Sequence, residues 1–325
     1  MTPLERALRE RIQAEGPISV ESYMEACNAY YYATRDPLGA AGDFTTAPEI
    51  SQMFGEIVGA ALVDCWNRAG APADAIYAEL GPGRGTLASD ALRVMRSAGF
   101  AGEAYLVETS PVLREAQREA VPTAQWHETL AQLPRKPLLL IANEFLDALP
   151  IRQFVGAVER RVAIAAGGLA FDRDGEIVET SPAREELIAE LAKRLTAHGG
   201  VALIIDYGHQ RSAAGDTLQA VRGHRYAAIL ADPGEQDLTA HVDFEAVRRA
   251  ASDAGATATP LVPQGEWLKR LGIEARAESL ARYNLGQRED IRIGLERLTS
   301  PAQMGELFKV IAIHSPEWPT PAGFP

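Results

Sequence analysis

The sequence has few of the residues that build disulfide scaffolds and metal centres. Only 2 of its 325 residues are cysteines, Cys27 and Cys65, and 6 are histidines. Neither residue type recurs at the short spacings of a zinc site, and no H-E-x-x-H, G-x-S-x-G or P-loop motif is present. The sequence therefore argues against a disulfide-stabilised fold, a metal site, a serine hydrolase and a nucleoside triphosphatase.

Clusters of positive charge and long hydrophobic runs are also missing. There are 32 Lys and Arg residues against 44 Asp and Glu, a net charge of −12, and no basic stripe of the kind that binds nucleic acid. No stretch of 18 apolar residues exists, so no helix is expected to span a membrane. The first residues resemble neither a secretory signal nor a mitochondrial transit peptide, because they include early glutamates and no apolar segment. We expect a soluble protein of the cytoplasm.

The remaining composition is that of a folded globular protein. Hydrophobic residues make up 46% and charged residues 23% of the chain, which excludes general disorder. Apolar residues recur at helical spacing in residues 18–27 and 50–66, and the second stretch follows a Thr46-x-x-Glu49 sequence typical of a capping box. We predict a helical N-terminal segment over residues 1–72.

From residue 75 onward, short apolar segments alternate with segments of helical periodicity. The predicted strands are 75–80, 104–108, 137–142, 201–206 and 308–313, and the predicted helices are 87–98, 111–120 and 184–198. Such alternation is typical of a mostly parallel, doubly wound sheet, so we predict the α/β class with a Rossmann-like arrangement. We expect residues 73–325 to form this domain, with an antiparallel β insertion at about 151–180 and a second insertion at about 211–300.

The segment Glu79-Leu80-Gly81-Pro82-Gly83-Arg84-Gly85-Thr86 joins the first of these strands to the next helix. Glycines at alternate positions allow a sharp turn and a close approach of the backbone to a ligand, and the following helix N-terminus favours negative charge. The pattern E-x-G-x-G-x-G differs from the G-x-G-x-x-G of dinucleotide sites and favours S-adenosylmethionine over NAD. The predicted cofactor-binding residues of this segment are Glu79, Gly81, Pro82, Gly83, Gly85 and Thr86.

Glu108 ends the next predicted strand. In a doubly wound fold, a carboxylate at that place accepts hydrogen bonds from the hydroxyl groups of a nucleoside ribose. A tight turn and a solvent-exposed strand end would explain the glycines and Glu108 separately. The strand, loop, helix, strand and terminal carboxylate together favour the nucleoside site.

Polar residues also follow the predicted buried strand 137–142. Ligands in open α/β sheets bind beyond the carboxyl ends of the strands. We therefore predict that Asn143, Glu144 and Asp147 meet a substrate at the reactive end of the cofactor. Capping of the next turn by Asn143 and Asp147 is the structural alternative.

A further candidate precedes the helical stretch 50–66. Asp43, Phe44 and Thr45 are predicted to fold over the cofactor as a lid. A helix-entry loop capped by Asp43 explains the same residues. Asp206-Tyr207-Gly208-His209 ends another predicted strand and is a further candidate for lining the same crevice, although packing is the commoner role of such a Tyr and His.

Together, these segments resemble the MidA-like family of class I S-adenosylmethionine-dependent methyltransferases, which are related to a mitochondrial complex I assembly factor. The resemblance extends from about residue 18 to residue 313, and the segments that carry it are 42–56, 79–87, 143–150, 206–208, 237–244 and 304–309. It implies a seven-stranded methyltransferase sheet with an inserted α+β subdomain, and S-adenosyl-L-methionine as the cofactor.

The resemblance also implies roles for individual residues. Gly81, Gly83 and Gly85 match the cofactor loop, and Glu108 matches the ribose ligand. Glu144 is similar to the substrate-binding glutamate of arginine methyltransferases, whose second acidic position is Asp147 here. The implied reaction is methylation of arginine in a protein substrate. The mitochondrial branch links this reaction to complex I assembly, so a respiratory complex I subunit is an expected partner.

Three other functions remain open from the sequence. One is a methyltransferase that acts on a small molecule or on a non-arginine acceptor. Another is an assembly chaperone that binds S-adenosylmethionine as a structural ligand. The third, an NAD-dependent oxidoreductase, is disfavoured by the glycine spacing. The sequence does not define the oligomeric state, and a homo-oligomer remains open.

Overall fold

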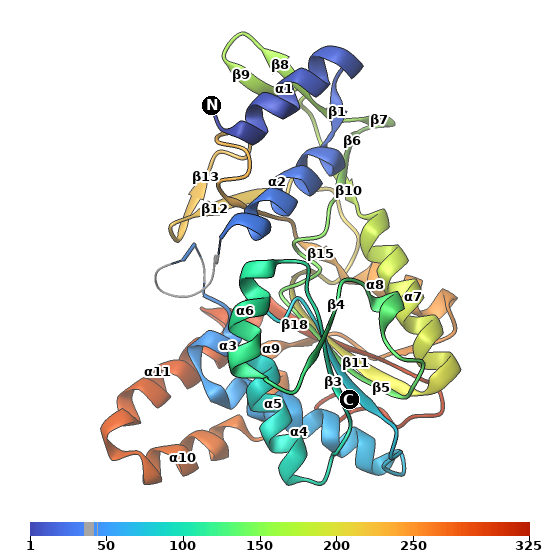
Figure 1. The fold of residues 1–325 in the computed structure, drawn as a ribbon, viewed down its shortest axis with the longest axis vertical. Coiled ribbons are helices and arrows are strands. Elements are labelled where there is room, and N and C mark those ends of the chain that lie inside the picture. Colours follow the sequence, from blue (N-terminus) through green and yellow to red (C-terminus); the bar gives the residue numbers. More distant parts are fainter. Residues whose placement is uncertain (36–41, 44) are drawn as a thin grey trace.

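The computed structural model describes residues 1–35, 42–43 and 45–325 (Figure 1). Within them, seven strands form the central sheet in the order β4-β3-β2-β5-β11-β18-β16, and β15 and β17 add short pairings to it. These strands are β2 (Ile76–Leu80), β3 (Ala104–Val107), β4 (Gln125–His127), β5 (Leu138–Asn143), β11 (Gly200–His209), β15 (Val242–Asp243), β16 (Thr257–Ala258), β17 (Val262–Pro263) and β18 (Phe308–His314). Neighbours from β4 to β11 are parallel, and β18 is antiparallel to β11. The predicted α/β class with a mostly parallel sheet is confirmed.

Strands β2, β3 and β5 are buried at every position, because helices cover both faces of the sheet. The helices are α4 (Gln52–Arg68), α5 (Thr86–Ser97), α6 (Pro111–Ala120), α7 (Pro182–His198) and α8 (Phe244–Asp253). On β5, Leu139 and Ile141 pack in the core with α4 and α5. Leu138 and Leu140 point to the other face and pack with α7 and α8. Both cores therefore hold the sheet rigid up to the carboxyl ends of its strands.

One predicted helix is broken in the structure. The stretch predicted as continuous from residue 50 to 66 is α3 (Ala47–Ile50) followed by α4, with Ser51 extended at φ −163°. The Ser51 hydroxyl accepts a hydrogen bond from the Met53 amide and starts the second helix. The predicted capping box is wrong as well, because the Thr46 side chain makes no capping hydrogen bond. Glu49 instead accepts a hydrogen bond of 2.5 Å from the Thr86 hydroxyl.

The N-terminal helices share a third core with strands that are inserted much later in the chain. The elements of this unit are α1 (Pro3–Glu15), β1 (Ile18–Ser19), α2 (Val20–Thr34), β6 (Arg152–Val155), β7 (Val158–Glu159), β8 (Arg161–Ala165), β9 (Gly168–Phe171), β10 (Ile177–Thr180), β12 (Gln219–Arg222), β13 (Arg225–Ala227) and β14 (Asp237–Thr239). Tyr23 and Met24 of α2 pack there with Val162 and Leu238. Figure 1 shows this unit at one end of the molecule, with α2 running toward the central sheet.

The C-terminal helices complete the cover of the sheet. They are α9 (Gln264–Arg270), α10 (Ile273–Tyr283), α11 (Arg288–Thr299) and α12 (Met304–Leu307). Glu56 of α4 is buried and accepts hydrogen bonds from Arg276 of α10 at 2.6 and 2.8 Å and from Arg93 of α5 at 2.9 Å. Although burial opposes ionisation, these hydrogen bonds lower the pKa of Glu56. Within the described ranges, no helix combines the length and apolarity that a membrane span requires.

Close packing of α4 against α5 depends on a glycine, which gives a test of the fold. A Cβ at Gly59 would lie 2.6 Å from the Ala91 carbonyl oxygen and 2.7 Å from its Cα. Backbone atoms cannot yield locally, so we expect Gly59→Val to lower the free energy of unfolding by about 2 kcal/mol or more. Ala60→Val, on the exposed side of the same helix, should cost about 0.5 kcal/mol. Equal urea midpoints for the two variants would contradict this packing.

Candidate functional site

A cavity of about 450 Å³ lies beyond the carboxyl ends of β2, β3 and β5. Eight of the residues proposed from the sequence line it, namely Glu79, Gly81, Pro82, Gly83, Thr86, Glu108, Asn143 and Glu144. Helix α2 and the start of α3 form the opposite wall. The structure therefore brings together the glycine loop and the polar residues that end two further strands. This is the position at which open α/β sheets bind their ligands.

The three glycines of the loop all have positive φ angles, of 60° for Gly81, 55° for Gly83 and 85° for Gly85. Side-chain-bearing residues are strained in this region, so the turn requires glycine. A Cβ on Gly81 would also meet the Phe145 ring at 2.6 Å, and one on Gly85 would meet the Ala120 Cβ of α6 at 3.2 Å. Gly85 is not among the residues that line the cavity. At these two positions the missing side chain makes room for protein neighbours, in addition to any ligand.

Glu79 is buried on β2 at the floor of the cavity. Its carboxyl group accepts a hydrogen bond of 2.7 Å from the Tyr77 hydroxyl. Burial raises the pKa of Glu79 to about 8, and the Tyr77 hydrogen bond opposes that rise.

Glu108 follows β3 and faces the cavity. One carboxylate oxygen accepts a hydrogen bond of 2.7 Å from the Ser110 amide. Burial raises the pKa of Glu108, and hydrogen bonds from Ser110 and Gln117 partly offset this effect. Each carboxylate oxygen has two lone pairs, so this side chain can still accept hydrogen bonds from a ligand in the cavity.

Glu144 occupies a strained backbone conformation at the end of β5. Its φ angle of 50° lies in the left-handed region, which costs a non-glycine residue about 1–3 kcal/mol. Its Oε1 atom accepts hydrogen bonds of 3.2 Å from the Ala47 amide and from Asn143 Nδ2. The residue lines the cavity and is half-buried, and its desolvation, together with the charge of Asp147, raises its pKa to about 8. The same geometry leaves Asn143 Oδ1 buried without a hydrogen-bond partner among the described residues.

Asp147 lies behind the cavity wall and does not line it. Its amide and that of Leu146 donate hydrogen bonds of 3.2 and 2.9 Å to the buried Asp206 carboxylate. Burial raises the pKa of Asp147, and a hydrogen bond with Tyr207 and the charge of Arg184 oppose this rise. Its Oδ1 atom has no hydrogen-bond partner among the described residues.

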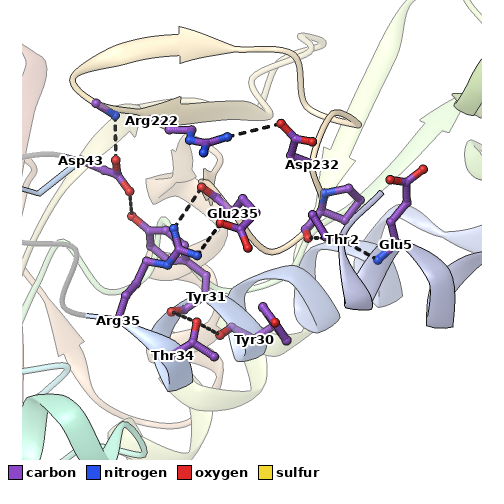
Figure 2. A network of polar contacts seen from close by, with 12 residues as sticks. Thr2, Glu5, Tyr30, Tyr31, Thr34, Arg35, Asp43, Arg222, Asp232 and Glu235 are labelled. Carbon is purple, nitrogen blue, oxygen red and sulfur yellow. Dashed lines mark hydrogen bonds and ion pairs between the residues drawn. The ribbon is translucent and has the colours of Figure 1, made fainter.

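The predicted lid residues take different positions. Phe44 lies outside the described residues, and Thr45 does not line the cavity, although its neighbour Thr46 does. Figure 2 shows the Asp43 carboxylate bonded to the Tyr31 hydroxyl of α2. The same carboxylate accepts a hydrogen bond of 2.7 Å from the Gly223 amide in the turn between β12 and β13. Asp43 thus ties α2 to this hairpin, and its side chain is not part of the cavity lining.

Some lining residues were missed because the sequence gives no local signal for them. Asn28 and Tyr32 lie on α2, which reads as an ordinary amphipathic helix. The Tyr32 hydroxyl donates a hydrogen bond of 2.8 Å to Asp237 of β14. Burial, followed by the charge of Asp147, raises the pKa of Asp237 to about 7. Only the folded chain brings residues 32, 144 and 237 to one place.

Comparison with known proteins identifies a family and several relatives. A family model described as "Putative S-adenosyl-L-methionine-dependent methyltransferase" matches residues 57–168 and 157–262. Protein arginine methyltransferase NDUFAF7 homolog, mitochondrial, of Drosophila melanogaster is 37% identical and covers 95% of this chain and 84% of its own. Protein arginine methyltransferase NDUFAF7, mitochondrial, of Homo sapiens is 32% identical over 96% of this chain and 83% of its own. These matches favour a methyltransferase over an NAD-dependent oxidoreductase.

A solved structure agrees with these matches. The crystal structure of a Burkholderia thailandensis protein bound to S-adenosyl-homocysteine has a TM-score of 0.88 and 28% sequence identity to this chain. It covers 98% of this chain and 93% of its own. The similarity therefore extends over the whole fold, including the cavity and the N-terminal helices.

The comparisons correct the expected location. The relatives of Drosophila, zebrafish and human are all named as mitochondrial proteins, which contradicts the prediction of a cytoplasmic protein. That prediction was wrong because it used properties of the folded domain. Two free, buried cysteines and an acidic composition suit any compartment that keeps thiols reduced.

The raised pKa of Glu144 predicts a pH-dependent stability. Between the ordinary glutamate pKa of 4.5 and about 8, the folded state binds more protons than the unfolded chain. The free energy of unfolding therefore falls as the pH rises through this window. Glu144→Gln removes this ionisation, so we expect the ligand-free variant to match wild type at pH 5 and to be roughly 1–3 kcal/mol more stable at pH 8. Urea unfolding across this range measures the difference.

The exposed Glu115→Gln serves as the control and should follow wild type at both pH values. Parallel stability curves for Glu144→Gln and wild type would contradict a protonated Glu144.

Proposed function

This chain belongs to the family of S-adenosyl-L-methionine-dependent methyltransferases, and on that premise we propose that it methylates arginine side chains of a protein acceptor. The enzyme class and the cofactor, S-adenosyl-L-methionine, are those of the family. The acceptor is the part of the proposal that rests on the chemistry of the cavity. The names of the relatives, which are protein arginine methyltransferases, support it.

The cavity fits the cofactor at its glycine-loop end. Gly81 and Gly83 present backbone without side chains, and Glu108 presents a fixed carboxylate that can accept hydrogen bonds from two adjacent ribose hydroxyls. We assign the hold on the cofactor to Glu79, Gly81, Pro82, Gly83, Thr86 and Glu108, with Gly85 shaping the turn. Bound S-adenosyl-L-methionine supplies an electrophilic methyl group. The protein must align this methyl group with the acceptor atom and provide a binding environment that suits the acceptor.

An unpaired hydrogen-bond acceptor at the acceptor end of the cavity carries the proposal. Asn143 lines the cavity, and its Oδ1 atom is buried without a hydrogen-bond partner among the described residues. The Glu144 carboxyl group lies beside it and accepts a hydrogen bond from Asn143 Nδ2. Buried acceptors without donors are costly, so such a site favours a ligand with several N–H groups. A guanidinium carries five N–H donors and a positive charge, and it fits both requirements.

A metal ion is a weaker explanation of the same cluster. Within the described residues, no three or more His, Cys, Asp or Glu side chains are grouped to hold one. The Asn143 amide oxygen and the Glu144 carboxylate also match a planar guanidinium, which binds carboxylates bidentately.

Glu144 is placed to orient the acceptor. Its pKa of about 8 means that the carboxyl group is largely protonated at pH 7 when no cation lies beside it. Entry of a guanidinium favours the ionised form, because an opposite charge nearby lowers the pKa of a carboxyl group. The carboxylate then holds two N–H groups and leaves the third nitrogen for reaction. We assign the proton released by that nitrogen to water, because the Asp147 side chain does not line the cavity.

Asp237 is a further carboxyl group that we assign to the surroundings of the acceptor end. Like that of Asp147, which the sequence offered as the second acidic position, its side chain does not line the cavity. Tyr32 lines the cavity and holds Asp237 through its hydroxyl group. Asp237, which is distant in sequence, thus lies close enough to Glu144 for its charge to contribute to the raised pKa of that carboxyl group.

The identity of the protein acceptor is a finer proposal. The resemblance to the family related to a complex I assembly factor makes a respiratory complex I subunit the acceptor that we propose. We also retain a homo-oligomer as a proposed state.

The experiment that tests the function is methyl transfer to cell protein. Purified protein is incubated with S-adenosyl-L-methionine carrying a heavy methyl group and with a lysate from cells that lack the protein. Mass spectrometry should find heavy methyl groups on arginine in one or a few proteins. Labelled small molecules without labelled protein would contradict the proposed acceptor, and no labelled product at all would support a chaperone.

Substitution of Glu144 separates acceptor binding from cofactor binding. We expect Glu144→Gln to lower methyl transfer by at least about 100-fold, because removal of the charge leaves the guanidinium without its ion pair. Binding of S-adenosylhomocysteine, measured by calorimetry, should change by less than about threefold, since the contacts of the glycine loop are unaltered. Glu115→Gln, an exposed glutamate on α6, is the matched control. Retained turnover in Glu144→Gln would refute this role.

A further inference from the structure

We propose that Gln117 is a positioning residue that holds the carboxylate of Glu108 and the loop carbonyl of Gly83 in fixed positions relative to each other. In this way it determines how strongly the ribose of the cofactor is bound. Gln117 lies on α6 and is 0% exposed. It does not line the cavity. The inference depends on the cofactor of the family and not on the identity of the acceptor.

Three hydrogen bonds define the orientation of the Gln117 amide. The Trp126 indole N–H donates to Gln117 Oε1 at 2.8 Å. This bond directs the amide nitrogen to the other side, where it donates to the Gly83 carbonyl at 2.7 Å and to Glu108 Oε2 at 3.3 Å. A glutamine amide has two N–H donors and both are used here. The Trp126 bond thus distinguishes the two ends of the amide, and a reversed amide would place an oxygen against two acceptors.

The bond to Gly83 links α6 to the glycine loop, and close packing reinforces this link. Gln117 Cα and Cγ would lie 3.5 and 3.6 Å from a Cβ on Gly85, so the helix backbone packs directly on the turn. The loop therefore cannot shift without displacing Gln117. This contact also explains why Gly85 is required although it does not line the cavity.

The bond to Glu108 completes the set of donors on that carboxylate. The Ser110 amide occupies Oε1 at 2.7 Å, and Gln117 occupies Oε2. With one donor on each oxygen, the carboxylate plane is fixed and its remaining lone pairs face the cavity. Two neighbouring hydroxyl groups of a ribose can then donate to it without any reorganisation of the side chain.

The test compares two ligands that differ only in the ribose. The first is S-adenosylhomocysteine, and the second is its analogue without the 2′ and 3′ hydroxyl groups. Calorimetry measures the binding of each to the full chain of wild type, Gln117→Leu and Trp126→Phe. We expect Gln117→Leu to weaken S-adenosylhomocysteine by about 10- to 100-fold, the loss typical of a hydrogen bond to a charged group. The same change should weaken the dideoxy analogue by less than about threefold.

Trp126→Phe keeps the glutamine but removes the donor that orients it. It should give a smaller loss with the same dependence on the ribose hydroxyls, which protects the test if Gln117→Leu folds poorly. Gln125→Leu, an exposed glutamine on β4, is the matched control and should bind both ligands as wild type does. Equal losses for both ligands would show a merely structural role. Unchanged binding of S-adenosylhomocysteine to both variants would likewise overturn the proposal.

Discussion

Three buried carboxyl groups, on Asp147, Asp206 and Asp237, lie with the half-buried Glu144 at the carboxyl edge of the central sheet, and desolvation raises the pKa of all four. The guanidinium of Arg184 is buried nearby, but its N–H groups donate to backbone carbonyls, among them those of residues 146, 147, 240 and 241. Arg184 therefore braces the loops and does not bond the carboxylates. A protein that maintains this arrangement pays in stability. The charge of Arg184 offsets part of this cost at Asp147 and Asp206, and we infer that a bound cation offsets it at Glu144.

The packing of the surrounding elements holds these carboxyl groups in place. Two packed cores fix the ends of β2, β3 and β5, so the loops that follow them begin from rigid positions. The third core brings α2 and β14 to the same edge. Asn28 then bridges three segments by donating to the carbonyls of Ala148 and Leu238 and accepting from the Leu238 amide. The N-terminal helices and the inserted strands thus serve as the wall that closes the acceptor end.

The sequence predicted those parts of the site that are local in the chain. The glycine loop, Glu108 and Glu144 follow directly from strands whose apolar runs are easily read, and a parallel sheet places all strand ends at one edge. It did not predict the roles of Tyr32, Gln117 or Asp237, because these roles depend on contacts between segments that are far apart in the chain. For Asp237 the only signal was its place in segment 237–244 of the family resemblance. The prediction of one continuous helix from residue 50 to 66 was wrong at Ser51. The Ser51 hydroxyl caps a new helix there, and hydrophobic periodicity does not indicate such a cap. The prediction of a cytoplasmic location was wrong because composition describes the folded domain and carries no information on the compartment in which the protein works.

The central claim, that Glu144 exchanges a proton for a guanidinium, is tested most directly by counting protons. An arginine peptide is titrated calorimetrically at pH 7 into the protein saturated with S-adenosylhomocysteine, in buffers of different ionisation enthalpy. With the Glu144 pKa at about 8 in the empty site, close to one proton should be released per peptide bound. A citrulline peptide should release none. Binding of the arginine peptide without proton release would contradict the account.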